Sequence, residues 1–409
     1  MLSDVFFRHI HQYRPTLYIG CMTGTSADKF ADFTLACFSS EGDLRFHANQ
    51  AILIPPTLQR SLRHLSEECQ SNASSVAMMQ TEAKLTHFLA RAFLEAIAKW
   101  KLSEYPKTKI ILSPHGQTVY HNPQEKQTHQ LCDGMLLHNL TGYPVAHGHR
   151  QACIKVSNAA PLAPVLLQEI FKASEQRLLI INGGGIANLT VIEEGNGTIT
   201  GFDTGPANGP LDSLIQHAID HGDPSLNEQI RRDGFDHNGA VAKKGRLIPQ
   251  LFNRLINSSF FSRPHNEKSA DRSEFNLNWI GTEAINQNTL ADLLHTTASV
   301  VATSITNAIR QHTTRLTTNH VFFYGGMCHN GFVMDLICNS LNPHKHIQVK
   351  SLHQLGFDVD FIESLLMAYL GYCVQTQRHI DLRYCSTMTS ATCIPGFFIS
   401  TRKETENAK

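Results

Sequence analysis

The sequence lacks the features that would place it in a membrane, a disulfide-bonded scaffold or a nucleic-acid complex. No apolar run approaches the roughly 18 residues that a transmembrane helix needs. The ten cysteines are scattered without a C-x-x-C pair, which is typical of reduced thiols rather than a disulfide framework. Lysine plus arginine and aspartate plus glutamate both number 35, so no excess of positive charge indicates a polyanion as partner.

Two common catalytic patterns are also absent. The chain has no G-x-x-x-x-G-K-[ST], which disfavours a P-loop nucleotide site, and no H-E-x-x-H zinc motif. Histidine is frequent, at 23 residues, but His138, His147 and His149 lack a zinc-like spacing, so we interpret them as solvated or polar-core side chains. The first residues contain neither a long apolar segment nor a small-residue cleavage site, and we therefore expect a cytoplasmic protein without a signal peptide.

The pattern of apolar residues predicts an α/β protein in which one structural unit occurs twice. At 409 residues, with 42% apolar side chains, the chain is long enough for two globular domains. In each half, three strands precede a helix and a further strand. The predicted segments are 16–22, 33–38, 44–54, a helix from Ser75 and 109–112, then the paired strands of 177–194, the strand TITGF, a helix over 289–309 and 320–326.

This repeat predicts two lobes that face each other across a cleft lined by glycine turns. We place the first lobe at residues 1–145 and the second at 146–409, with the C-terminal helix able to pack back on the first lobe. A Gly-Asn-Gly sequence at 195–197 indicates a hairpin. The polar stretches 220–245 and 258–288 are interpreted as loop-rich insertions suited to substrate binding or closure.

The stretch TGTSAD, from Thr23 to Asp28, predicts a phosphate-binding turn. Its glycine leaves backbone N–H groups unshielded and its hydroxyls add donors, a combination typical of an anion nest. Asp28 is a suitable ligand for Mg²⁺, which prefers carboxylate, water and phosphate oxygens. A hairpin with a polar tip is the alternative explanation of the same residues.

The segment GFDTGPANGPLD places Asp203 at a strand end, immediately before a Gly/Pro turn. A carboxylate in that position can act as a general base or orient a nucleophile. Asp212 lies further on, where it is expected to do no more than favour the helix N-terminus. Ordinary turn chemistry is the alternative for Asp203.

Three further motifs place glycine or polar side chains at strand ends. The motifs NGGGIAN at 182–188 and YGGMCHN at 324–330 put paired glycines where the backbone can approach a nucleotide, with tight packing as the alternative. In SPHGQTVYHNP, His115 and Gln117 can hydrogen-bond a polar ligand such as a sugar. A core histidine with satisfied hydrogen bonds is the competing interpretation of His115.

Taken in order, these motifs resemble the anhydro-N-acetylmuramic acid kinase family, a member of the actin/hexokinase-like ATPases. The similarity runs from about Leu17 to Gly396, and GFDTGP and GGIANLT are specific motifs. The resemblance implies two actin-like (ribonuclease H-like) lobes flanking a nucleotide and sugar cleft. It also implies an enzyme, a phosphotransferase, that uses ATP, Mg²⁺ and water to open the 1,6-anhydro ring and phosphorylate O6 in peptidoglycan recycling.

The resemblance also implies roles for individual residues. Asp203 matches the catalytic base that takes a proton from the attacking water, which frees O6 to attack the γ-phosphate. The implied partner is a small-molecule sugar, and neither a nucleic acid nor a membrane is implied. Because members of the family often pair, a homodimer is a further expectation. The implied ATP and phosphate positions are Gly24, Thr25, Ser26, Ala27, Asp28, Lys29, Gly184, Gly185, Gly325 and Gly326, with Asp28 on Mg²⁺, and the sugar positions are His115, Gly116, Gln117, Thr118 and Arg150.

The chain departs from the family pattern at two places. In the first loop, Lys29 stands at a glycine position and Ala31 at an aspartate position. In segment 146–162, His147 and Ala152 stand at aspartate positions and His149 at an arginine position. Each lost charge removes hydrogen bonds worth roughly 1.5–3 kcal/mol. A non-catalytic relative that binds nucleotide or a muropeptide sugar, and a kinase for another small sugar, therefore stay open as alternatives.

Overall fold

The computed structural model of this chain contains two compact units, each with its own sheet and apolar core. The first unit consists of Met1–Ile170 together with Phe361–Lys409, and the second is Phe171–Asp360. The structure describes residues 12–23, 29–68, 75–172, 174, 176–194, 199–264, 268, 270, 272–313, 319–344, 346–385 and 390–400.

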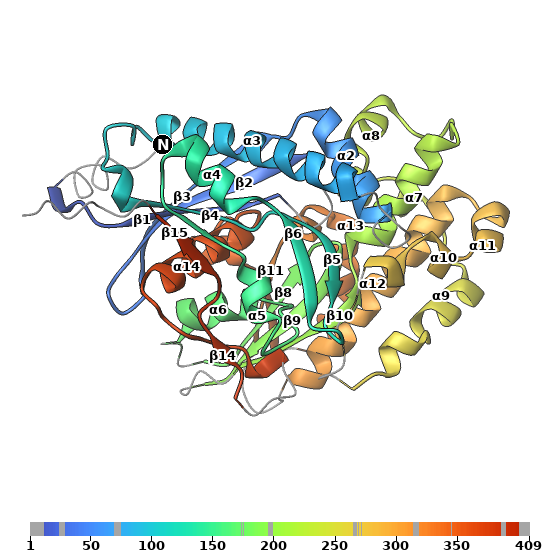
Figure 1. The fold of residues 1–409 in the computed structure, drawn as a ribbon. Coiled ribbons are helices and arrows are strands. Elements are labelled where there is room, and N and C mark those ends of the chain that lie inside the picture. Colours follow the sequence, from blue (N-terminus) through green and yellow to red (C-terminus); the bar gives the residue numbers. More distant parts are fainter. Residues whose placement is uncertain are drawn as a thin grey trace, which may run out of the picture. The chain divides into compact units, whose positions relative to one another are not determined.

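The first unit is built on a six-stranded sheet, most of whose strands are labelled in Figure 1. In sheet order these are β15 (Phe397–Ile399), β7 (Val145–His147), β4 (Ile110–Pro114), β1 (Leu17–Met22), β2 (Phe30–Phe38) and β3 (Leu44–Leu53). The strands β1, β2 and β3 form an antiparallel meander, and β4 lies parallel to β1 on its other side. The four strands that the sequence predicts here are confirmed, and every residue of β1 is buried.

Helices and two small ribbons complete the first unit. The predicted helix from Ser75 is confirmed, and its buried face carries Leu85, Phe88, Leu89 and Phe93. The helices are α2 (Pro56–Glu68), α3 (Ser75–Lys99), α4 (Gly134–Thr141), α5 (His149–Cys153), α6 (Ala163–Phe171) and α14 (Ile362–Gln375), and the ribbons are β5 (Gln117–Asn122) with β6 (Gln127–Leu131) and β13 (Ile380–Asp381) with β14 (Thr392–Cys393).

The second unit is built on a five-stranded sheet with the same kind of connectivity. In sheet order its strands are β10 (Ile199–Pro206), β9 (Ile186–Ile192), β8 (Leu178–Gly183), β11 (Asn319–Tyr324) and β12 (Ile347–Ser351). The strands β8, β9 and β10 are an antiparallel meander, and β11 lies parallel to β8. The repeat predicted from the sequence is therefore present, because in each unit a parallel strand adds to the first strand of a three-stranded meander.

Helices of the second unit cluster around the long central α12 (Leu290–His312), which confirms the helix predicted over 289–309. Thr289 caps it by accepting the Asp292 N–H. The stretches expected to be loop-rich contain short helices as well. The remaining helices are α7 (Asn208–Asp220), α8 (Glu228–Asp233), α9 (Pro249–Ile256), α10 (Leu277–Ile280), α11 (Thr282–Gln287) and α13 (Gly331–Leu341). The hairpin expected at 195–197 lies outside the described residues.

The division into units differs from the boundary expected after residue 145. The chain enters the second unit at Phe171 and returns to the first at Phe361. The segment after 145 stays with the first unit because β7 pairs with β4 and β15. The final helix α14 belongs there too, since it packs against β1 and β2.

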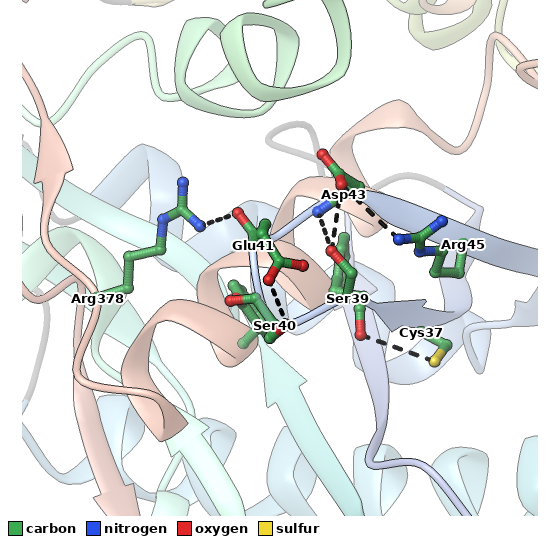
Figure 2. Close-up of polar contacts among 9 residues, drawn as sticks. Cys37, Ser39, Ser40, Glu41, Asp43, Arg45 and Arg378 are labelled. Carbon is green, nitrogen blue, oxygen red and sulfur yellow. Dashed lines mark hydrogen bonds and ion pairs between the residues drawn. The ribbon is translucent and has the colours of Figure 1, made fainter. Parts of the chain in front are cut away.

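The turn between β2 and β3 is held by polar contacts within the first unit, which Figure 2 shows. Ser39 Oγ accepts the backbone N–H of Asp43 over 3.1 Å. Arg378, just beyond α14, donates to the Glu41 carbonyl and, over 3.0 Å, to the carboxylate of Glu169 on α6. These bonds tie the turn to α6 and to the end of α14 in its own unit.

Candidate functional site

In the first unit, two predicted motifs meet at the ends of neighbouring parallel strands. Thr23 directly follows β1, and its buried hydroxyl lies 3.1 Å from the Gly116 carbonyl oxygen and 3.2 Å from Gln117 Oε1. The His115 N–H, just beyond β4, donates to the Cys21 carbonyl over 2.9 Å. Because parallel neighbours end at the same edge of a sheet, the start of the TGTSAD stretch and the HGQT segment lie together.

Gly116 makes the turn that carries the HGQT segment away from β4. Its φ is +76°, and a Cβ there would lie 2.4 Å from the Leu131 carbonyl oxygen. Backbone geometry therefore requires glycine at this position. The turn leads Gln117 and Thr118 into the β5–β6 ribbon, where Thr118 Oγ1 accepts a hydrogen bond from Gln130 Nε2 over 3.3 Å.

Buried His115 and half-buried Arg150 form a side-chain pair within the first unit. Arg150 lies on α5 and donates from Nε to His115 Nε2 over 2.8 Å and from Nη1 to the Ala159 carbonyl over 2.7 Å. Burial, reinforced by the nearby Arg150 charge, lowers the pKa of His115 to about 3. The imidazole is therefore neutral near pH 7, and the guanidinium carries the positive charge of the pair.

The histidines and alanines that depart from the family pattern occupy interior positions. His149 is buried, with Nδ1 2.6 Å from the Pro395 carbonyl oxygen and Nε2 3.0 Å from Ser113 Oγ, and burial lowers its pKa to about 4. His147 packs against Phe397, and burial lowers its pKa as well. Ala31 is fully buried in β2, and Ala152 is half-buried on α5.

The predicted phosphate loop can be placed only at its two ends. Gly24, Thr25, Ser26, Ala27 and Asp28 lie outside the described residues, between buried Thr23 and exposed Lys29. The Lys29 carbonyl accepts the Ile54 N–H over 2.9 Å, which anchors the far end of the loop to the sheet. The expected roles of these residues in binding phosphate and Mg²⁺ stay predictions.

In the second unit, two glycine turns lie at the ends of the adjacent strands β8 and β11. The carbonyl of Gly184 accepts the Asn208 N–H over 2.9 Å, and the carbonyl of Gly185 accepts two further amides at the start of α7. A Cβ on Gly325, whose φ is +85°, would lie 2.6 Å from Asn182 Oδ1, whereas a Cβ on Gly326 would find its nearest neighbour 3.6 Å away. Gly325 is therefore required by packing, and Gly326 is not.

Asp203 is buried in β10 and is held by backbone groups. Its N–H donates to the Lys268 carbonyl over 3.0 Å, and its Oδ2 accepts the Ala270 N–H over 2.8 Å. A β-bulge between Asp203 and Gly205 alters the local register of the strand, a device that re-aims side chains. The carboxylate therefore has a fixed direction, as a general base requires.

A row of polar side chains crosses the sheet beside Asp203. Asn188 on β9 is the cross-strand neighbour of Asp203 on one side and of Asn182 on the other. Asn188 is buried, and its Oδ1 has no hydrogen-bond partner among the described residues. Sequence reasoning missed this row, although both asparagines belong to the quoted NGGGIAN motif and the strand pattern would have aligned them.

The described ranges contain no cluster of three or more His, Cys, Asp or Glu side chains able to hold a metal ion. His138, interpreted above as a polar-core histidine, is buried, and its Nδ1 lies 2.7 Å from the Tyr143 carbonyl oxygen. None of the helices in these ranges has both the length and the apolar character of a membrane span.

Comparisons with known proteins agree over nearly the whole chain. A family model described as anhydro-N-acetylmuramic acid kinase matches residues 16–383. Curated kinases of that name are similar to this chain. The one from Idiomarina loihiensis is 33% identical over 88% of this chain and 93% of the relative, and the one from Haemophilus influenzae is 30% identical over 88% and 92%. The relative from Acinetobacter baylyi is 29% identical over 90% and 94%.

Matches of this extent, with the mixed α/β architecture, define the chain as a kinase. More specifically, it belongs to the anhydro-N-acetylmuramic acid kinase family. Among solved structures, a hexokinase from Schistosoma mansoni complexed with glucose is similar at a TM-score of 0.42 and 8% identity, covering 87% of this chain and 85% of that one. A similarity of that size carries no argument, and the assignment rests on the family match.

Proposed function

We propose that this kinase opens 1,6-anhydro-N-acetylmuramic acid with water and phosphorylates its O6 with ATP. Family membership supports the reaction class. The observation that carries the proposal is the buried carboxylate of Asp203, whose Oδ2 accepts the Ala270 N–H while the backbone N–H of the same residue donates to the Lys268 carbonyl. The reaction consumes one sugar, one ATP and one water and yields N-acetylmuramic acid 6-phosphate and ADP, a step in peptidoglycan recycling.

In the proposed reaction, Asp203 accepts a proton from the water molecule whose oxygen forms a bond to the anomeric carbon. The bond between that carbon and O6 breaks, and O6 takes the γ-phosphoryl group as ADP leaves. Asp28 would be the ligand that holds Mg²⁺, which would neutralise charge on the phosphates. Because ATP is the phosphoryl donor, we place the protein in the cytoplasm. We also expect a homodimer, which size-exclusion chromatography tests.

The remaining proposed roles follow the family motifs. The glycine turns lie close to the phosphates of ATP, and the HGQT segment together with Arg150 binds the sugar. The residues proposed for ATP are Gly24, Thr25, Ser26, Ala27, Asp28, Lys29, Gly184, Gly185, Gly325 and Gly326, and those for the sugar are His115, Gly116, Gln117, Thr118 and Arg150.

The test is mass spectrometry of 1,6-anhydro-N-acetylmuramic acid incubated with the protein, ATP and Mg²⁺. We expect a product heavier by one water and one phosphoryl group. Asp203→Asn should lower its rate of formation roughly 10²- to 10⁴-fold, the usual contribution of a general base. The matched control is Asp212→Asn, an exposed carboxylate of the same motif, for which we expect a change of less than threefold.

Binding of ATP, measured by calorimetry, separates the alternatives. Absence of product despite ATP binding would overturn the proposal for this sugar and favour a nucleotide-binding relative or another sugar substrate. Full activity of Asp203→Asn would refute its role as the base.

A further inference from the structure

Two cysteines that are distant in the sequence are in contact within the first unit. Cys153 is the last residue of α5, and Cys393 is the last residue of β14, 240 residues further along the chain. Their sulfur atoms lie 3.7 Å apart. The sulfurs of a disulfide lie about 2.0 Å apart, so each partner is already in van der Waals contact with the atom to which it would bond.

The two thiols have different surroundings. Cys153 is fully buried, whereas Cys393 is half-buried. The hydrogen bond that the Cys153 thiol gives lowers the pKa of Cys393, and the same contact together with burial raises the pKa of Cys153. Peroxides react with the thiolate of an accessible cysteine, and a neighbouring thiol can then complete a disulfide. The asymmetry makes Cys393 the thiol that reacts first and Cys153 the thiol that resolves.

The stretch around Cys393, residues 390–400, is here called the C-terminal segment. It contains β14, which pairs with β13, and β15, which pairs with β7. Its contact with α5 includes a second bond, because His149 Nδ1 lies 2.6 Å from the Pro395 carbonyl oxygen. The structure therefore already seats this segment against α5, at the place where the two sulfurs meet.

We propose that Cys153 and Cys393 are a peroxide-sensitive thiol pair, which closes to a disulfide and clamps the C-terminal segment to α5. The loop closed by this bond would contain the whole second unit, residues 171–360. The inference goes beyond the proposed kinase reaction and does not depend on it, because neither the sugar nor ATP takes part.

The reaction has two steps, and the oxidant is hydrogen peroxide. The thiolate of Cys393 attacks one peroxide oxygen and the O–O bond breaks, which leaves a sulfenic acid on Cys393 and releases the other oxygen as water with the proton that the thiol lost. The sulfur of Cys153 then attacks the Cys393 sulfur. The S–O bond breaks, and a second water leaves with the proton of Cys153. Two thiols and one peroxide thus give one disulfide and two waters.

The experiment maps the disulfide in the full-length chain. Protein treated with hydrogen peroxide is blocked with N-ethylmaleimide and digested with trypsin without reduction. We expect peptide 151–155 joined to peptide 384–402, with a mass two hydrogens below the sum of the two. Cys153→Ser and Cys393→Ser should each abolish the joined species, and absence of this species from the wild-type digest would overturn the proposal.

Peptide 384–402 also contains Cys385, which is buried. Cys385→Ser is therefore the matched control, and it should retain the link between the two peptides. Loss of the link in this variant would assign the bond to Cys385 and refute the proposed pair. Should Cys153→Ser not fold, Cys393→Ser and Cys385→Ser still decide the assignment, because both leave the buried Cys153 intact.

The order of the two steps can be tested by trapping the sulfenic acid with dimedone. In the double variant Cys153→Ser with Cys385→Ser, the reagent should label Cys393, because the resolving thiol is gone. In Cys393→Ser with Cys385→Ser, Cys153 should stay unlabelled. Labelling of Cys153 instead of Cys393 would reverse the order of attack and refute the proposed role of Cys393.

The clamp itself is measured by thermal unfolding. A cross-link that closes a long loop restricts the unfolded chain, so oxidation should raise the melting temperature of the first unit by about 4 °C or more. Dithiothreitol should reverse the rise. Cys393→Ser should show no rise after the same treatment, whereas Cys338→Ser, which removes an exposed cysteine of the second unit, should show the full rise. A mapped disulfide without any rise would refute the clamp.

Discussion

The two units hold their candidate functional groups in different ways. In the first unit, Arg150 is fixed by another side chain, that of His115, and by one carbonyl. In the second, Asp203 is fixed by the backbone of Lys268 and Ala270. A side-chain support depends on residue identity and protonation, whereas a backbone support depends only on the path of the chain. The side-chain support of Arg150 should therefore be lost on acidification. The backbone support of Asp203 should be lost when the N–H group that it accepts is removed.

A fall in pH should have the largest effect on stability, and it should destabilise the first unit. His115 and His149 have pKa values lowered to about 3 and about 4, while an unfolded histidine titrates near 6.5. Between those values the unfolded chain binds more protons, so stability falls as pH falls below about 6.5. Each histidine should contribute about 1.4 kcal/mol per pH unit in that window, and nothing above it.

Hydrogen exchange at pH 5 and pH 7 measures this difference by segment. We expect protection in β4 and α5 to decrease at pH 5 before protection in β8–β10 does. His149→Gln should reduce the pH dependence of stability by one proton. Equal losses of protection from exchange in the two sheets at pH 5 would refute this difference between the two units.

A change at residue 270 should damage the second unit through its backbone. Ala270→Pro removes the N–H that Asp203 Oδ2 accepts, a bond of roughly 1.5–3 kcal/mol because one partner is charged. We expect kcat to fall about 10- to 100-fold while the melting temperature changes by only a few degrees. Ala270→Ser keeps the N–H and should retain activity, and comparable losses in the two variants would contradict a backbone support.

Adjacent glycines in the second unit provide the smallest predicted effect. Gly325→Ala would place a side chain at a positive φ and against Asn182, at a cost of about 1–3 kcal/mol. Gly326→Ala has room and should cost less than 0.5 kcal/mol. Thermal unfolding measures both. If Gly326→Ala raises KM for ATP without changing stability, the nucleotide lies beside that turn, as proposed.

Helices and strands could be predicted from the sequence where the pattern of apolar residues within a short window determines them. Period-two and period-3.6 patterns predict β1, β8, α3 and α12 because each element shows its buried face within a short window. Strand β12 and the short helices within 220–245 and 258–288 have weak patterns and were not predicted. The division of the chain also depends on distant pairings, such as β15 with β7, for which no local pattern exists.

The candidate site shows the same limit. The motifs indicate His115, Arg150 and Asp203 individually, without the groups that hydrogen-bond them. Their supports are remote in the chain, since Arg150 lies 35 residues from His115 and Ala270 lies 67 from Asp203. One sequence gives no measure of which distant pairs touch, so sequence reasoning found neither the Arg150 N–H that His115 accepts nor the Ala270 N–H that Asp203 accepts.

The return of the chain to the first unit at Phe361 has a consequence for folding during synthesis. Residues 171–360 form a continuous unit that can complete its core as soon as it leaves the ribosome. The first unit must wait for α14 and β15, which are translated after the whole of the second unit. Although it starts first, the N-terminal unit should be the last to become native, and until then the face of β1 that α14 covers needs protection from aggregation.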